Sequence, residues 1–290
     1  MPELPEIQTI ITDLQQVILN KKITNINVKL PKIIKNKLSF FKKELLNNSF
    51  LKLQRRGKLM IFYLQKGDYV LLIHLKMTGQ LIYHKKNKII AGGHHEIKNL
   101  FNLPSKTTHI IFTFQDQAKL FYNDGRQFGY LKLIKQKELS LILDKYGVEP
   151  LSSQFTLSYL KKLFKGKKRN IKAFLLDQSQ IAGLGNIYVD ESLFFAKIHP
   201  QEKINSLTLE QVKKLHQGIK KILQQSIKLR GTTFNTFVDA NGNRGSFVSR
   251  LKVYQKEGQK CSRCQKGIIK KIVVAGRGTR FCPICQKLNH

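Results

Sequence analysis

The chain has 290 residues, of which 41% are hydrophobic, and this is enough apolar material for two domains with cores of their own. No apolar run reaches the roughly 18 residues of a membrane-spanning helix, and the acidic, proline-containing start is unlike a secretory signal. We therefore expect a soluble cytoplasmic protein. The 52 Lys and Arg against 18 Asp and Glu give a net charge of +34, which makes a phosphate polymer the first partner to consider.

Arginine is scarce in this lysine-rich chain, which holds only ten arginines. Heavy use of Lys, Ile and Asn is typical of an AT-rich genome, so codon usage is an alternative explanation for part of the lysine excess. An arginine that persists against this background indicates a need for the planar guanidinium fork, which fits phosphates and base edges.

A helix is predicted directly after the opening segment Met1–Glu6, because apolar residues follow at the spacing of one helical face. If Met1 is removed, Pro2 presents a secondary amine beside the Glu3 carboxylate. An immobilised amine with a neighbouring acid is what Schiff-base chemistry on an aldehyde requires. The alternative is that these residues only start a helix. The apolar face consists of Ile7, Ile10, Ile11, Leu14, Val17 and Ile18.

Strand patterns dominate residues 50–134, where β-branched and aromatic residues alternate or run continuously. Turn signals such as Asn123–Gly125 separate the strands. This arrangement predicts a β-sandwich or barrel flanked by the first helix. We interpret residues 85–106 as a long exposed loop, with His94 and His95 at the surface. The predicted strand segments are Leu51–Leu64, Tyr69–Met77, His109–Phe114, Lys119–Tyr122 and Gly129–Ile134.

After a boundary at Tyr146–Pro150 the apolar spacing becomes helical. The last predicted helix begins with Thr208–Gln211, which fits a capping box, and its buried stripe is expected from Leu209 to Ile227. Asn186 follows two glycines and is expected to cap the third helix, whose exposed N–H groups would suit a phosphate. A plain helix–turn–helix corner is the alternative. The predicted helices cover residues 156–165, 170–177, 186–196 and 208–230.

All four cysteines lie near the C-terminus as two C-x2-C pairs. Their spacing is a strong signature of a tetrahedral structural zinc site that closes a β-hairpin, and disulfides are unexpected in a reducing cytosol. Residues 267–275 are predicted as one strand and 276–278 as the hairpin tip. This hairpin is basic, so Arg277 is predicted to insert into nucleic acid, an ordinary exposed turn residue being the alternative. The ligands would be Cys261, Cys264, Cys282 and Cys285.

Together these segments resemble the formamidopyrimidine-DNA glycosylase family, bacterial enzymes that remove 8-oxoguanine. The resemblance spans nearly the whole chain, and the order of its motifs argues against coincidence. The motifs are PELPE at 2–6, QRRGK at 54–58, HLKMTG at 74–79, DGRQFG at 124–129, AGLGNIYVDESLF at 182–194, HP at 199–200, RGTT at 230–233 and the four-cysteine finger.

The resemblance implies an α+β fold with an N-terminal β-sandwich and flanking helices, a helical helix–two-turn–helix domain and a C-terminal zinc-finger β-hairpin. Residues 1–135 would form the catalytic domain, 136–150 a linker, 151–250 the DNA-binding domain and 251–290 the finger. The loop from Thr232 to Phe247 matches the segment that closes over the damaged base, and we expect it to be mobile. The chain departs from the family pattern at Gln8, at Gln127 and in the long loop 85–106.

The resemblance also implies catalytic and phosphate-binding roles. Pro2 would be the nucleophile that attacks C1′ of the damaged nucleoside, and Glu3 the proton donor and acceptor. Lys58 would bind phosphate near the lesion. Asn186 and Arg277 would bind the phosphates that flank the flipped nucleotide, and we count Lys58 and Arg277 with the catalytic residues.

Other residues would complete the DNA contact in the same family pattern. Met77, Arg126 and Phe128 would fill the space that the flipped base leaves, with Arg126 paired to the orphaned cytosine. Packing in the protein core is the alternative for Met77 and Phe128. Arg169 and Tyr188 complete the predicted DNA-binding set.

The implied activity is that of a bifunctional base-excision repair glycosylase and AP lyase. It would remove oxidised purines through a Schiff base on Pro2 and cut the strand by β,δ-elimination. The implied cofactor is one structural Zn²⁺, and the implied partner is double-stranded DNA, bound by a monomer in the cytoplasm at the nucleoid. One alternative is an endonuclease VIII-like enzyme for oxidised pyrimidines, which Leu4 disfavours. The other is a non-catalytic zinc-finger nucleic-acid-binding protein, which would leave the Pro2–Glu3 pair unexplained.

Overall fold

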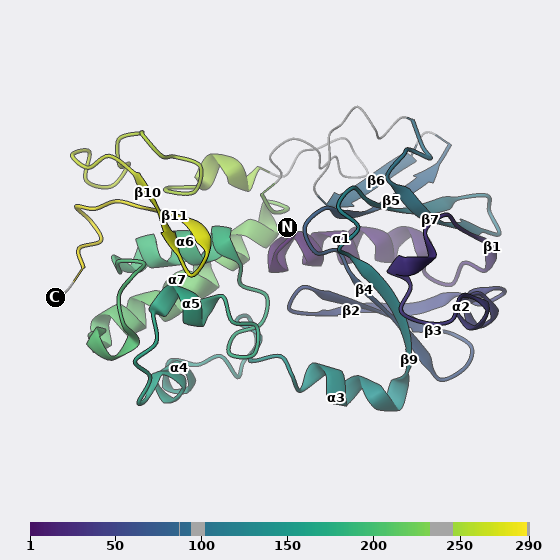
Figure 1. The fold of residues 1–290 in the computed structure, drawn as a ribbon, viewed down its shortest axis with the longest axis horizontal. Coiled ribbons are helices and arrows are strands. Elements are labelled where there is room, and N and C mark those ends of the chain that lie inside the picture. The colour runs from purple at the N-terminus through teal and green to yellow at the C-terminus, as the bar shows by residue number, and fades with distance from the viewer. Residues whose placement is uncertain (87, 94–101, 233–245, 289–290) are drawn as a thin grey trace. The chain divides into compact units, whose positions relative to one another are not determined.

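The computed structural model in Figure 1 describes residues 1–86, 88–93, 102–232 and 246–288. Contacts divide the chain into two compact units. The first unit comprises Met1–Asp144 and Leu229–Val248, and the second comprises Lys145–Lys228 and Ser249–His290. The predicted surface residues His94 and His95 and most of the loop from Thr232 to Phe247 lie outside the described residues.

The first unit contains two antiparallel sheets that form the expected β-sandwich (Figure 1). The five-stranded sheet has the order β1 (Ile23–Val28), β7 (Thr108–Phe114), β8 (Lys119–Asp124), β5 (Gly79–Lys85) and β6 (Lys88–Gly93). The four-stranded sheet has the order β2 (Phe50–Arg56), β3 (Leu59–Leu64), β4 (Tyr69–His74) and β9 (Tyr130–Lys135). Two shorter helices, α2 (Leu38–Leu45) and α3 (Leu139–Leu143), also belong to this unit.

The N-terminal helix α1 (Leu4–Ile18) is built into the core of the sandwich. It runs between the two sheets in Figure 1 and contacts β6 of one and β2 of the other. All six residues of its predicted apolar face are buried, which confirms that prediction. At Gly92 of β6 a Cβ atom would lie 2.2 Å from Cγ1 of Ile10, so glycine permits the close approach of strand and helix. The start of the chain is therefore fixed to the core.

The prediction of a loop over residues 85–106 is wrong in its first part. Residues 88–93 form strand β6, which pairs with β5 in a hairpin that closes at Lys85 and Lys88. The apolar run inside this strand is short, and its lysine-rich surroundings hid the strand pattern. Ile90 and Ala91 are nevertheless buried, and this burial explains why the segment joins the sheet.

The second unit contains α4 (Leu157–Phe164), α5 (Ile171–Leu175), α6 (Asn186–Ala196) and α7 (Leu209–Lys228), close to the four predicted ranges. The predicted capping box is confirmed, because Thr208 N donates to Gln211 Oε1 at 2.9 Å and Gln211 N to Thr208 Oγ1 at 3.2 Å. The predicted stripe of α7 is buried from Val212 to Leu223. Leu209 is 60% exposed because it is the first residue of the helix, so its predicted burial is wrong.

The C-terminal hairpin pairs β10 (Lys270–Val274) with β11 (Arg277–Phe281). The strand predicted from 267 to 275 is shorter than expected. The tip consists of Ala275 and Gly276, which have φ angles of 50° and 69°, and Arg277 already belongs to the return strand. None of the helices in the described part of the chain is long and apolar enough to cross a membrane.

Candidate functional site

The first turn of α1 holds the chain start in place. Pro2 is buried and Glu3, the residue before the helix, is 3% exposed. Glu3 N donates to Glu6 Oε2 at 3.0 Å, and Ile7 N donates to Glu3 O at 3.0 Å. A capping arrangement of this kind fixes the direction of the backbone at the helix start. Pro2 and Glu3 therefore share a buried, ordered position.

Glu6 also binds the second stretch of chain in the first unit, which begins at Leu229, and sequence reasoning missed this role. Its Oε1 accepts from Thr232 N at 2.8 Å and from Thr232 Oγ1 at 2.9 Å. Arg230 pairs with Asp13 of the same helix at 2.5 Å. The RGT sequence at 230–232 is thus attached to α1 directly before residues 233–245. The three-residue spacing of Glu3 and Glu6 is the local signal that could have indicated a capping role, but not the partner.

Lys58 lies in the turn between β2 and β3 and is 5% exposed. Its charge also acts on His74 at the end of β4. Burial, together with the charges of Lys76 and Lys58, lowers the pKa of His74 to about 3, so its ring is neutral at physiological pH. The neutral ring accepts a hydrogen bond at Nδ1 from Lys76 N, at 3.0 Å. Lys58 and Lys76 therefore place positive charge around the turn after β4, whereas His74 carries none.

Met77, Arg126 and Phe128 lie on two neighbouring turns of the first unit. Met77 is half-buried in the turn between β4 and β5, and Phe128 is 54% exposed between β8 and β9. The guanidinium of Arg126 lies 4.7 Å from the centroid of the Phe128 ring. The turns meet where Arg126 N donates to Thr78 Oγ1 at 2.9 Å. The structure therefore brings these three predicted residues together and excludes core packing for Phe128.

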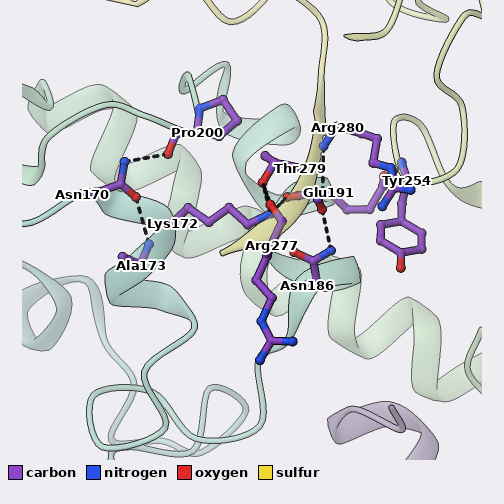
Figure 2. Close-up of polar contacts among 12 residues, drawn as sticks. Asn170, Lys172, Ala173, Asn186, Glu191, Pro200, Tyr254, Arg277, Thr279 and Arg280 are labelled. Atoms are coloured by element: carbon purple, nitrogen blue, oxygen red, sulfur yellow. Dashed lines mark hydrogen bonds and ion pairs between the residues drawn. The ribbon is translucent and has the colours of Figure 1, made fainter. Parts of the chain in front are cut away.

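Asn186 is the first residue of α6, and Gly185 rather than Asn186 occupies the capping position, so the predicted cap is wrong. The side chain reaches the finger instead, where Asn186 Nδ2 donates to Gly278 O at 2.8 Å. Figure 2 shows this contact beside Arg277, whose side chain extends away from it. Asn186 thus lies close to Arg277 in the second unit, and the predicted phosphate contacts of both residues stay a prediction.

A fully buried ion pair lies behind this contact and was missed in the sequence. Lys172 Nζ contacts Asp190 Oδ1 at 2.5 Å and donates to Thr279 Oγ1 at 2.7 Å, while Arg280 N donates to Asp190 Oδ2 at 3.0 Å (Figure 2). Burial raises the pKa of Asp190 to about 6, against the opposing effect of Lys172. Because Lys172 is on α5, Asp190 on α6 and Thr279 on β11, the pair joins three elements.

Glu191, the next residue of α6, holds the segment that leads into the finger. Its Oε1 accepts from the backbone N of Lys252, Val253 and Tyr254, at 3.0, 2.9 and 2.9 Å. Burial raises the pKa of Glu191, and these three N–H groups act in the opposite direction. Neighbouring acids of one helix thus bind two different parts of the C-terminal segment.

Two predicted DNA-binding residues have partners inside the second unit. Tyr188 is fully buried, and its Oη lies 2.6 Å from Ser226 Oγ in the contact between α6 and α7. The structure therefore places this side chain in the helix core, where burial argues against the predicted direct contact of the side chain with DNA. Arg169 pairs with Asp177 at 2.7 Å. Burial acts to raise the pKa of Asp177, but hydrogen bonds from Arg169 and Ser179 outweigh it and the pKa falls.

Several arginines serve internal contacts, contrary to the expectation that their guanidinium forks face phosphates or bases. Arg263 donates to Phe194 O at 2.7 Å and to Phe195 O at 3.3 Å. Arg55 donates to Gln8 Oε1 at 2.9 Å. Arg263 uses its planar fork to bind two carbonyl oxygens, but these acceptors belong to the protein and not to a nucleic acid.

The four cysteine thiols gather at the base of the C-terminal hairpin, with all sulfur atoms within 4.8 Å of one another. The Sγ atoms of Cys261 and Cys285 are 3.8 Å apart, as are those of Cys264 and Cys282. A tetrahedron with Zn–S bonds of about 2.3 Å has S···S edges of about 3.8 Å, whereas a disulfide needs about 2.05 Å. The site therefore fits one structural Zn²⁺.

The chain is similar to known proteins along its whole length. Residues 1–131 match the formamidopyrimidine-DNA glycosylase N-terminal domain, 146–238 the H2TH domain of the same enzymes, and 258–288 a zinc finger found in FPG and IleRS. A formamidopyrimidine-DNA glycosylase from Pelotomaculum thermopropionicum is 40% identical over 292 residues, which cover 100% of both chains.

Solved structures of Lactococcus lactis Fpg with DNA are similar as well. Its complex with abasic-site DNA matches at 36% identity with a TM-score of 0.85, covering 98% of this chain and 99% of the other. Its complex with DNA that contains an oxidised pyrimidine matches at 37% identity and a TM-score of 0.85, covering 99% and 100%.

Proposed function

Because the chain belongs to the formamidopyrimidine-DNA glycosylase family, we propose that it is a base-excision repair DNA glycosylase and AP lyase for oxidised purines in duplex DNA. The observation that supports this most directly is the buried Pro2–Glu3 pair at the start of α1. A nucleophile needs a fixed position beside an acid, and the anchored helix start supplies it.

In the proposed reaction, the amine of Pro2, freed by removal of Met1, forms a bond to C1′ of the damaged nucleoside. The glycosidic bond breaks, the base leaves with the bonding electron pair, and the departing base takes up the proton that the amine of Pro2 loses. Glu3 donates a proton to the sugar ring oxygen as the ring opens, which leaves a Schiff base between Pro2 and C1′. Loss of a proton from C2′ then expels the 3′ phosphate, and loss of a proton from C4′ expels the 5′ phosphate. These eliminations leave a one-nucleotide gap, and water hydrolyses the Schiff base and releases the enzyme.

The proposed phosphate contacts come from both units. In the first unit, Lys58 offers a positive charge close to His74, whose ring is neutral. In the second, Asn186 and Arg277 lie together at the start of α6 and at the finger, and Arg169 is an additional candidate. Each such contact would add salt-dependent affinity, because binding of a cation to phosphate releases counterions.

Met77, Arg126 and Phe128 are proposed to fill the space that the flipped base vacates. Their two turns meet through Arg126 N and Thr78 Oγ1, and Phe128 is exposed. An apolar ring and a thioether replace the lost stacking, and the guanidinium offers a fork of donors to the unpaired cytosine. Stacking of Arg126 over Phe128 orients that fork.

The zinc ion is structural, because Cys261, Cys264, Cys282 and Cys285 fill all four positions of a tetrahedron and leave none for substrate. We further propose that the protein acts as a monomer in the cytoplasm at the nucleoid. The four-part division at residues 1–135, 136–150, 151–250 and 251–290 also stays a proposal.

Borohydride trapping tests this function. Protein with a confirmed Pro2 terminus is incubated with a duplex that contains 8-oxoguanine opposite cytosine, and reduction of the Schiff base would leave a covalent adduct. We expect wild-type protein to be trapped and a Pro2→Gly variant to be trapped far less. No adduct would contradict the proposal.

An oxidised-pyrimidine duplex belongs beside the purine substrate, because the similar L. lactis protein has been solved with such DNA. Faster trapping on 8-oxoguanine supports the purine assignment. Preference for the pyrimidine would favour an endonuclease VIII-like specificity. A DNA complex without any adduct would leave a binding protein only.

A further inference from the structure

A single buried carboxylate, Asp124, binds both turns that carry Met77, Arg126 and Phe128. Asp124 is the last residue of β8 and is 0% exposed. Its Oδ1 accepts from the Thr78 hydroxyl and, at 3.3 Å, from Arg126 N. Its Oδ2 accepts from Gly129 N at 2.7 Å. Donors beside Met77 and at both ends of the second turn therefore converge on one side chain.

The sheet fixes Asp124 itself. Its backbone N donates to Thr107 O at 2.9 Å, its carbonyl accepts from His109 Nε2 at 2.8 Å, and it pairs with Gly79 of β5. The carboxylate therefore lies where β8 ends and β5 begins. The first turn leads directly into β5 and the second follows β8 directly, and these two strands pair with each other in the sheet. The Asp124 side chain can therefore hold both turns in a fixed position relative to the sheet.

Close packing leaves the turns little freedom to move apart. A Cβ atom at Gly129 would lie 1.9 Å from Tyr122 Oη and 3.0 Å from Asp124 Oδ2, so only glycine brings its N–H to the carboxylate. A Cβ atom at Gly79 would lie 2.4 Å from Leu75 O. Glycine at the end of each turn thus permits the close approach on which the shared contact depends.

We propose that Asp124 is a positioning residue that holds Met77, Arg126 and Phe128 as one preformed wedge for entry into duplex DNA. This inference rests on the proposed function. A carboxylate suits the role because it offers only acceptors, and three donors converge on it here. An amide of the same shape would turn one NH2 group toward those donors and lose at least one contact.

The test separates wedge positioning from chemistry by means of two substrates. Asp124→Asn is compared with wild type in single-turnover excision of 8-oxoguanine from a duplex, and in borohydride trapping on a single-stranded oligonucleotide with a preformed abasic site. The single strand has no stack to open and no partner base to replace. We expect a loss of about tenfold or more on the duplex and a change within about twofold on the single strand.

Asp116→Asn is the matched control, because Asp116 is a hydrogen-bonded aspartate in the β7–β8 turn of the same sheet. It should keep the wild-type ratio of the two activities. Thr78→Val is the second variant, which removes one donor and leaves the buried carboxylate. We expect it to change the ratio in the same direction, less than Asp124→Asn does, and to add little to Asp124→Asn in the double variant.

The outcomes distinguish the two proposals. If wild-type protein reacts with both substrates and neither variant changes their ratio, Asp124 does not position the wedge and the proposed function stands. Equal losses on both substrates would assign Asp124 a general structural role and overturn the inference. If Asp124→Asn does not fold, the ratio measured for Thr78→Val decides. Wild-type protein that reacts with neither substrate would overturn the proposed function, and this inference with it.

Discussion

Replacement of Lys172 by Met should destabilise the second unit strongly and in a pH-dependent way. Lys172 and Asp190 are both 0% exposed in their side chains, so Lys172→Met leaves a buried carboxylate without its cation. Loss of one partner from a buried ion pair costs about 3–5 kcal/mol. Two hydrogen bonds from Lys172, to Asp190 and to Thr279, disappear together, and this supports the upper part of the range.

The sign of the pH dependence follows from Asp190. Burial already raises its pKa to about 6, so the folded state binds this proton more tightly than the unfolded state does, and ionisation destabilises the fold as pH rises from about 4 through 6. Without Lys172 the pKa rises further, because the cation that contacts the Asp190 carboxylate is removed, although the charge of Arg280 still acts to lower this pKa. The cost of Lys172→Met should therefore be largest near pH 8 and shrink toward pH 5.

Thermal and urea unfolding followed by far-UV circular dichroism measures this cost, since the chain has no tryptophan. The double variant Lys172→Met/Asp190→Leu is the control, because it removes both charges and should recover much of the loss at pH 8. A cost below about 1 kcal/mol, or one that does not vary between pH 5 and pH 8, would refute the reasoning.

Three further outcomes are expected. Removal of zinc by a chelator should unfold the finger and abolish specific DNA binding; full binding after metal loss, verified with a colorimetric zinc indicator, would contradict this. Arg277→Ala should reduce the salt dependence of DNA affinity by about one phosphate contact in a fluorescence anisotropy titration, and an unchanged slope would remove Arg277 from the interface. Burial acts to raise the pKa of Asp116, but hydrogen bonds from Lys21 and Lys85 outweigh it and lower the pKa to about 2. Above pH 4, Asp116→Asn should therefore lower the melting temperature slightly, which corresponds to a loss of about 1 kcal/mol or less in the free energy of unfolding. The difference from wild type should vanish as the pH falls toward 2. A difference that stays constant with pH would show that the ion pairs are not its source.

Sequence reasoning worked where the signal is local. The apolar face of α1, the capping box at Thr208 and the spacing of the cysteines each depend on residues close together in the chain, and each matches the structure. Strand β1 was missed because its Asn- and Thr-containing sequence acquires its conformation by pairing with β7, more than 80 residues away. Pairing at that distance leaves no periodicity within the strand itself.

The site was predictable as a list of residues but not as a set of contacts. Family motifs indicated Met77, Arg126 and Phe128, and the structure places them on adjoining turns. Nothing local indicates that Asp124 binds both turns, because its two sets of donors lie 46 residues and 2–5 residues away. The side chain of Tyr188 was misjudged for the converse reason. Its neighbours in the motif suggested DNA, whereas its partner Ser226 lies on another helix.

The placement of acidic residues connects these observations. The chain has only 18 acids, yet several of the described ones are buried or half-buried and hold polar groups near the proposed site. Glu6 binds Thr232, Asp124 binds two turns, and Asp190 and Glu191 bind the finger and the segment before it. A carboxylate used internally removes negative charge from the surface while it fixes a backbone segment. The lysine-rich surface therefore keeps more of its positive potential for attracting a phosphate backbone, and the same carboxylates set the geometry of the groups that would meet it.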